Sequence, residues 1–190
     1  NSYLISFTAG PDFVAVKDMN HDGTNDLVVA CNGSSGVVSV LLGNGNGTFQ
    51  NPVNTTVGTY NYALATGDFN GDGTNDVAVT DYDAGTVTVL LGKGDGSLLY
   101  KGVYNVGAQA QSVATADFNG DGTNDLVVAA GTNAAVLLCN GDGTFRTPVK
   151  YDWLRLNTVV GDFNGDGKTD LASAVLNNAT SIGVVLGNGD

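Results

Sequence analysis

Short apolar runs rich in Val, Leu, Ala and Thr alternate with polar, glycine-rich segments along the whole chain. The order recurs four times, the last time without its final run: a run of small residues, a loop rich in Asp, two further apolar runs, a glycine-rich turn and a final run. Such runs, bounded by Gly, Asn and Asp, predict β-strands. The first runs are Phe13–Val16, Ala63–Thr66, Ser112–Ala116 and Thr158–Val160; the second are Leu27–Ala30, Val77–Thr80, Leu126–Ala130 and Leu171–Val175; the third are Val37–Leu42, Thr86–Leu91, Ala134–Leu138 and Ile182–Leu186; the fourth are Phe49–Val57, Leu98–Val106 and Phe145–Tyr151. The pattern predicts an all-β fold with four antiparallel strands per repeat.

A nine-residue loop with oxygen-bearing side chains separates the first two runs of each repeat. These acidic loops are residues 18–26, 68–76, 117–125 and 162–170. Side-chain oxygens at positions 1, 3, 5 and 9, a carbonyl at position 7 and a glycine at position 6 are typical of a loop that wraps a hard cation. The predicted ligand positions are Asp18, Asn20, Asp22, Thr24, Asp26; Asp68, Asn70, Asp72, Thr74, Asp76; Asp117, Asn119, Asp121, Thr123, Asp125; and Asp162, Asn164, Asp166, Lys168, Asp170.

The loops differ from an EF-hand, which needs a glutamate at position 12 and flanking helices. Here position 12 is Val or Ser and the flanks are strand-like, so we expect the aspartate at position 9 to close the site. Asp, Asn and Gly also form turns without a metal, but four copies with the same ligand positions favour a metal. We therefore predict about four Ca²⁺ ions, one per repeat.

The repeat spacing predicts the architecture. The loops begin at residues 18, 68, 117 and 162, and a period of this length with several short strands indicates a β-propeller. We expect a single domain over residues 1–190, with repeats at about 9–58, 59–107, 108–152 and 153–190 plus 1–8. The last repeat lacks a fourth run, and the segment Ser2–Phe7 has the phase of one. Either this segment completes the last blade and covers its open edge, or a longer array has been cut at a turn.

The chain resembles the FG-GAP/VCBS repeats of integrin α-subunit propellers and many secreted bacterial proteins. The loop Asp-x-Asn-x-Asp-Gly-x-x-Asp and the turn Leu-Gly-Asn-Gly-(Asn/Asp)-Gly-Thr-Phe carry the resemblance over essentially the whole chain. It implies calcium in the loop between strands 1 and 2, with strand 1 innermost. Integrin-type propellers usually have more than four blades, so this chain is a four-bladed ring, half of a ring made by two copies, or a fragment.

The amino-acid composition limits the classes of partner that the protein is expected to bind. All 19 acidic residues are Asp, the formal net charge is −12, and twelve of these Asp lie in the acidic loops. This charge argues against nucleic acid and anionic membranes as partners, and no apolar run reaches membrane-spanning length. Weak multi-Asp sites suit millimolar extracellular calcium, which favours a secreted or cell-surface protein. Cys31 and Cys139 lie in non-adjacent repeats, so we expect two free thiols.

The connections on the face opposite the acidic loops vary between repeats, which makes them the better candidates for a specific function. Aromatic, amide and charged side chains there suit a sugar or a protein partner; large aromatics also serve as packing residues. The candidate ligand-binding residues are Tyr60, Tyr62, Asp81, Tyr82, Asp83, Gln109, Gln111, Trp153 and Arg155. The sole histidine, His21, is expected to point outward from its loop, and no catalytic motif is found.

These observations favour an extracellular, calcium-binding, non-catalytic recognition or adhesion module for a protein or carbohydrate. A structural scaffold, or a propeller that self-assembles into a larger ring as a homo-oligomer, is a second hypothesis. An accessory propeller of a polysaccharide-degrading enzyme is a third.

Overall fold

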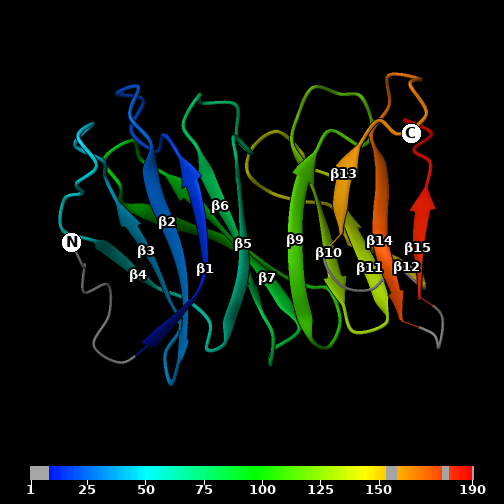
Figure 1. Ribbon diagram of the computed structural model, residues 1–190, viewed down its shortest axis with the longest axis horizontal. Helices are drawn as coiled ribbons and strands as arrows, with labels where there is room; N and C mark the ends of the chain where they lie inside the picture. Colours follow the sequence, from blue (N-terminus) through cyan, green and yellow to red (C-terminus); the bar gives the residue numbers. More distant parts are fainter. Residues whose placement is uncertain (1–8, 153–157, 177–179, 190) are drawn as a thin grey trace.

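The computed structural model describes residues 9–152, 158–176 and 180–189, and all regular secondary structure in these segments is β (Figure 1). In chain order the strands are β1 (Ala9–Lys17), β2 (Asp26–Gly33), β3 (Val37–Leu41), β4 (Val53–Thr56), β5 (Asn61–Gly67), β6 (Asp76–Asp81), β7 (Thr86–Gly92), β8 (Leu98–Asn105), β9 (Ala110–Ala116), β10 (Asp125–Ala130), β11 (Asn133–Leu137), β12 (Val149–Asp152), β13 (Val159–Gly161), β14 (Asp170–Leu176) and β15 (Thr180–Val185). No helix long and apolar enough to span a bilayer occurs in the described segments.

The strands form four antiparallel sheets in which neighbours along the chain are neighbours in space. Sheet 1 contains β1–β4, sheet 2 β5–β8, sheet 3 β9–β12 and sheet 4 β13–β15. The predicted strand order is confirmed. Two fourth strands are shorter than predicted, because Phe49 and Phe145 each form only an isolated bridge, to Gly43 and Cys139 at the start of the preceding glycine turn. The predicted strand at Ser2–Phe7 lies outside the described residues.

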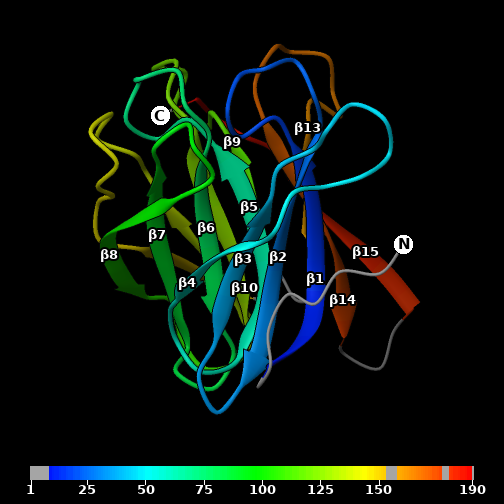
Figure 2. The ribbon, with the colours of Figure 1, turned by 90° about the vertical axis from the view of Figure 1, so that its left-hand side faces the viewer.

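The four sheets stand side by side, with β1, β5, β9 and β13 in a row (Figures 1 and 2). In every sheet the acidic loop and the glycine turn lie at one end of the strands. The connection between the second and third strands lies at the other end. In the described segments no ladder of hydrogen bonds joins sheet 1 to sheet 4. The prediction is therefore confirmed for four antiparallel sheets, whereas a closed propeller stays a prediction.

The core lies between the sheets. Sheets 1 and 2 bury Met19, Val28 and Val40 against Leu64 and Val79. Sheets 2 and 3 bury a larger cluster that includes Phe69, Leu126, Leu137 and Phe145. Between sheets 3 and 4 the buried cluster among the described residues is small and contains Val127, Ala134 and Leu171. The apolar runs found in the sequence thus pack one sheet against the next. We call each such interface a joint, and the joint between sheets 3 and 4 has the fewest buried apolar side chains among the described residues.

Candidate functional site

Each acidic loop is organised by its first aspartate. The Asp68 carboxylate accepts hydrogen bonds from the Gly71 N–H at 2.7 Å and the Gly73 N–H at 2.9 Å. The third and fourth loops repeat this arrangement around Asp117 and Asp162. The glycines at positions 4 and 6 have positive φ, which turns their N–H groups toward the carboxylate.

The fifth position of each loop carries a carboxylate that stays charged. The Asn20 amide and the Thr24 N–H hold the pKa of Asp22 below its usual value. Equivalent hydrogen bonds lower the pKa values of Asp72 and Asp166, and the Thr123 hydroxyl, with the Thr123 N–H and the Asn119 amide, lowers that of Asp121. In each loop the position-3 oxygen in turn accepts the position-5 N–H, as Asn70 Oδ1 does from Asp72 at 3.0 Å. Oxygen atoms therefore gather at positions 1, 3 and 5, as carboxylates at positions 1 and 5 and as an amide oxygen at position 3.

The aspartate at position 9 has a structural task. Asp76 is fully buried; its Oδ2 accepts the Phe69 N–H at 2.8 Å and its Oδ1 accepts the Gly92 N–H at 2.9 Å. It thereby ties the acidic loop to the turn after the third strand. Asp26, Asp125 and Asp170 do the same in their own repeats. The prediction that position 9 closes a metal site stays a prediction.

The electrostatics of these buried aspartates reveal repulsion within the loop. Burial raises the pKa of Asp76 to about 6, and the charges of Asp72 and Asp68 add to the rise. Burial also raises the pKa of Asp125, again with two loop aspartates contributing. Each loop thus crowds like charges that a bound cation would neutralise.

The first acidic loop has a histidine where the others have glycine, and this changes the hydrogen bonds around its first aspartate. His21 occupies the glycine position with φ 58° and is exposed, as expected. Asp18 Oδ1 is buried without a hydrogen-bond partner in the described segments, whereas its counterparts in the other loops accept a glycine N–H. An orphaned carboxylate oxygen among oxygen donors fits a hard cation such as Ca²⁺. No three acidic, histidine or cysteine side chains of the described segments converge as a metal site by themselves, so asparagine and carbonyl oxygens would have to contribute.

Three candidate tyrosines meet at the opposite end of the sheets. Tyr60, Tyr62 and Tyr82 form a cluster with ring centroids 5.7 to 6.4 Å apart. Tyr60 and Tyr62 are 36% and 42% exposed. Tyr60 lies at the end of the connection from β4 to β5, Tyr62 lies in β5, and Tyr82 lies in the turn after β6.

A hollow beside the tyrosine cluster lies along the row of first strands. It has a volume of about 300 Å³ and is lined by Asp12, Phe13, Tyr62, Ala63, Gln111, Ser112 and Val113. The strand register makes Asp12, Tyr62 and Gln111 equivalent positions of three successive repeats. We call this the axial hollow. Sequence reasoning missed Asp12, although superposing the repeats on their first strands would have found it.

The other predicted ligand residues are placed differently. Asp81 is buried, and its carboxylate accepts hydrogen bonds from the Thr59 N–H, the Thr59 hydroxyl and the Ala84 N–H. Burial raises the pKa of Asp81, but these hydrogen bonds outweigh it and leave the pKa below its usual value. Asp81 therefore holds the connection between sheets 1 and 2 and is not a surface residue, contrary to the expectation that it contacts a ligand.

Of the remaining candidates, Asp83 and Gln109 are exposed in connections, and Gln109 has φ 60°. Trp153 and Arg155 lie outside the described residues. Cys31 and Cys139 are both free and buried, which confirms the prediction of two free thiols.

Comparison with known proteins identifies the repeat. Three overlapping segments, residues 18–79, 68–128 and 117–173, match the model of the FG-GAP-like repeat. The chain belongs to the FG-GAP-like repeat family. Each matched segment runs from one acidic loop through the next, so the loops and the β-strands between them carry the match. No curated protein matches the chain.

Solved structures share the fold of this FG-GAP-like chain. An Agrocybe aegerita lectin, described for specific recognition of non-reducing terminal N-acetylglucosamine, is 18% identical with a TM-score of 0.50, over 93% of this chain and 66% of its own. The Vibrio cholerae biofilm matrix protein Bap1 is 22% identical with a TM-score of 0.52, over 86% and 28%. The Photorhabdus luminescens Tc holotoxin pore is 19% identical with a TM-score of 0.50, over 90% and 9%. The chain therefore spans less than two thirds of each of these proteins.

Proposed function

We propose that this chain is an extracellular, calcium-stabilised, non-catalytic recognition module whose four sheets are blades of a β-propeller. In this proposal it binds a carbohydrate at the tyrosine cluster and the axial hollow. The carrying observation is that Asp12, Tyr62 and Gln111, equivalent residues of three repeats, line one hollow next to two further tyrosine rings.

The chemistry of this surface suits a sugar. Exposed tyrosine rings offer flat apolar faces for the C–H side of a pyranose, and the carboxylate and amide orient its hydroxyl groups. A hollow of about 300 Å³ is at the lower end of ligand pockets, which fits one or two sugar units. The lectin with a similar fold is consistent with this use of the fold.

The first experiment is a glycan array with the purified chain in calcium, followed by titration of the best hit. We expect Tyr62→Ala and Gln111→Ala each to weaken binding by about 1–2 kcal/mol while the melting temperature changes little. Tyr100→Ala is the matched control, because Tyr100 is 58% exposed on the outer strand β8, away from the hollow. Binding that survives both hollow variants, or an array without hits, contradicts a glycan site here and leaves a protein partner as the alternative.

Calcium binding is tested by chelation. Positions 1, 3 and 5 of each acidic loop, with the position-7 carbonyl, would hold the ion and lose their mutual repulsion on binding. Because the ion binds the folded state, its removal should lower the melting temperature by several degrees, and restoring Ca²⁺ in excess of chelator should reverse the loss. A melting temperature that chelator leaves unchanged would contradict a stabilising metal.

Self-assembly is a second candidate function, favoured by apolar side chains of sheet 4 that are exposed in the part of the chain that the structure describes. Ile182, Val184 and Phe163 are 76%, 53% and 50% exposed, although the residues at equivalent places in sheets 1 and 2 are fully buried by the next sheet. An exposed apolar sheet face of this kind marks an interaction surface. Sedimentation over a range of concentrations distinguishes a monomer from a chain that associates through this face.

A further inference from the structure

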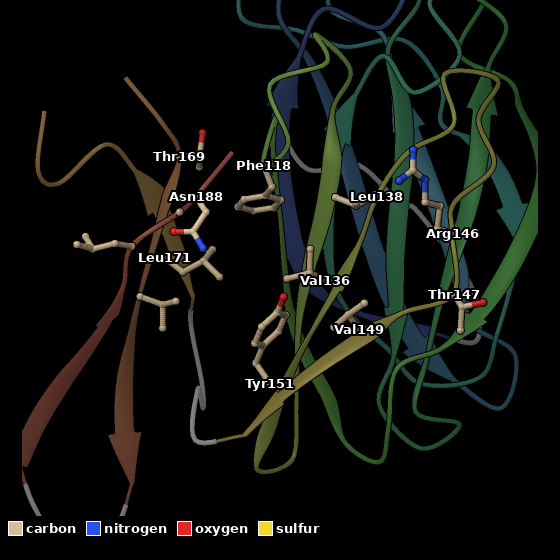
Figure 3. Close-up of a pocket in the computed structure, with 13 residues that line it drawn as sticks. Phe118, Val136, Leu138, Arg146, Thr147, Val149, Tyr151, Thr169, Leu171 and Asn188 are labelled. Carbon is tan, nitrogen blue, oxygen red and sulfur yellow. The ribbon is translucent and has the colours of Figure 1, made fainter. Parts of the chain in front are cut away.

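A cleft between sheets 3 and 4 differs in chemistry from the axial hollow (Figure 3). The cleft has a volume of about 600 Å³, and its lining is mainly apolar, with Phe118 and Val136 of sheet 3 facing Leu171 of sheet 4. Because its walls are the facing sides of two successive sheets, the cleft belongs to the joint between them. The axial hollow is smaller, but its lining includes the carboxylate and amide groups that give a binding site specificity.

The three equivalent residues of the axial hollow lie at β-bulges. The pairing of each first strand with its second strand shifts register at one place, and the residues skipped there include Asp12 in β1, Tyr62 in β5 and Gln111 in β9. A bulge bends the strand and re-aims a side chain. The same irregularity in three repeats thus brings a carboxylate, a phenol ring and an amide to one hollow. Because the bulge recurs while its side chain changes, these positions are suited to determine specificity.

Neighbouring polar groups hold two of these bulges in place. In the second sheet the buried Thr80 hydroxyl accepts the Ala63 N–H at 3.0 Å and donates to the Ala63 carbonyl at 3.2 Å. In the first sheet the Asn32 side-chain amide donates to the Asp12 carboxylate, and the Asn32 backbone forms a bridge to Tyr60 of the tyrosine cluster. The carboxylate is therefore oriented before a ligand binds, which is what a specific site requires.

The charge of the axial hollow is negative. Among the described lining residues Asp12 is the one that carries a charge, and it is exposed. A carboxylate has about four lone-pair sites, so the bond from the Asn32 amide leaves it able to accept hydrogen bonds from a ligand. Phe13 and Tyr62, both 42% exposed, contribute aromatic rings to the same lining. A carboxylate among aromatic rings attracts a cation, because the carboxylate pairs with it and a ring face adds a cation–π interaction.

We propose that the axial hollow is selective for amino sugars, with the ammonium group paired to the Asp12 carboxylate and the pyranose ring lying on Tyr62. This inference rests on the carbohydrate binding proposed above and names the class of sugar. A neutral sugar makes the same ring contact but replaces a charge-assisted hydrogen bond with a weaker, neutral one. A uronic acid would bring a second carboxylate toward Asp12, in a chain whose net charge is already −12.

The test compares three disaccharides that share one linkage and differ only in the group at the second carbon of each ring. They are the β-linked disaccharide of glucosamine, its N-acetylated form and cellobiose. Titration calorimetry of the 190-residue chain at mildly acidic pH keeps the amino groups charged. At low salt we expect the glucosamine disaccharide to bind about 3- to 10-fold more tightly than cellobiose. N-acetylation should abolish this advantage because it removes the charge, and high salt should reduce it because salt screens an exposed ion pair.

A pair of matched variants assigns the preference to Asp12. Asp12→Asn keeps the size of the side chain and removes its charge, so the ratio of the affinities for the glucosamine disaccharide and cellobiose should fall close to one. Asp152→Asn removes the same charge from an exposed residue of the outer strand β12, which does not line the hollow, and should leave the ratio unchanged. Melting temperatures of both variants show whether they are folded.

The outcomes separate this inference from the function on which it rests. Equal affinity of the unmodified chain for the glucosamine disaccharide and cellobiose leaves a carbohydrate site but overturns its selectivity for amines. A preference that Asp12→Asn retains also overturns the inference, because the net negative charge of the chain would then account for it. Binding of none of the three disaccharides overturns the inference as well. In that case hits elsewhere on the glycan array keep the carbohydrate function, and an array without hits removes both.

Discussion

Two joints of the molecule are built from copies of the same repeat but are closed to different degrees. One lies between sheets 2 and 3, and the other between sheets 3 and 4. The first encloses Phe69, Leu126 and Phe145 in a continuous core. Among the described residues, the second buries the smaller set Val127, Ala134 and Leu171 and leaves the cleft open. The acidic loops at the two joints have the same internal hydrogen bonds, so loop geometry does not by itself close a joint.

In the described segments two contacts across the joint distinguish the closed joint from the open one. One is the aromatic ring of the next repeat's glycine turn, which Phe145 supplies at the closed joint. The other is a position-8 asparagine: the Asn75 amide donates to the Asp18 carbonyl at 2.7 Å, and the Asn124 amide reaches the Asp68 carbonyl at 3.4 Å. The fourth loop has Thr169 at this position, whose shorter side chain offers no amide donor.

The largest expected effect compares the loop phenylalanine of the closed joint with that of the uncovered face. Phe69→Ala should cost about 3–5 kcal/mol of unfolding free energy, because it empties a fully buried ring site. Phe163→Ala should change stability by less than about 0.5 kcal/mol, because Phe163 is half exposed. Urea unfolding followed by circular dichroism measures both. Equal losses would show that a partner or a second copy covers sheet 4 in solution.

A smaller effect is expected from the asparagines between loops. Asn75→Ala should cost about 1 kcal/mol, since it removes one hydrogen bond and leaves the Asp18 carbonyl without it. The reciprocal change, Thr169→Asn, should stabilise the open joint by up to about 1 kcal/mol if the new amide reaches the Asp117 carbonyl. Hydrogen exchange of the β13 and β14 amides is the sharper measurement for the second variant. Exchange that Thr169→Asn leaves unchanged would show that the asparagine is not what closes a joint.

The smallest expected effect compares the first acidic loop with the others. His21→Gly should stabilise the chain by less than about 1 kcal/mol, because His21 has a left-handed backbone conformation where the other loops have glycine. The greater freedom of glycine in the unfolded chain offsets part of this gain. Gly71→His is the matched reverse change and should destabilise the second loop. Thermal melts of both variants at fixed calcium measure the pair, and opposite signs are the expected outcome.

Much of the fold was readable from the sequence because its signals are local. The apolar runs, their alternation with Gly, Asn and Asp, and the fixed spacing of the loops predicted every described strand to within a few residues. The face with variable connections was also identified, and the structure brings Tyr60, Tyr62 and Tyr82 together there. Repeats make such reasoning robust, because one pattern is seen several times in one chain.

The sequence did not reveal which polar side chains form hydrogen bonds inside the folded chain and are therefore not available to a ligand. Asp81 resembles an exposed turn residue, yet the chain around it supplies three hydrogen bonds to its carboxylate. Asp76 resembles a metal ligand, and in the structure both of its oxygens accept backbone N–H groups. These roles depend on amides that lie far away in the sequence or across a turn, so no local pattern could have indicated them.

The sequence by itself determined the repeat, the strands and the acidic loops, because backbone turns and side-chain alternation are set by neighbouring residues. Only the tertiary structure decided that Asp12, Tyr62 and Gln111 line one hollow, that Cys139 fits where other repeats need a glycine, and that one joint is closed while the next holds a cleft. These features arise where separate sheets meet. Their packing depends on the shapes of both surfaces at once, and a single strand's sequence contains only one of the two.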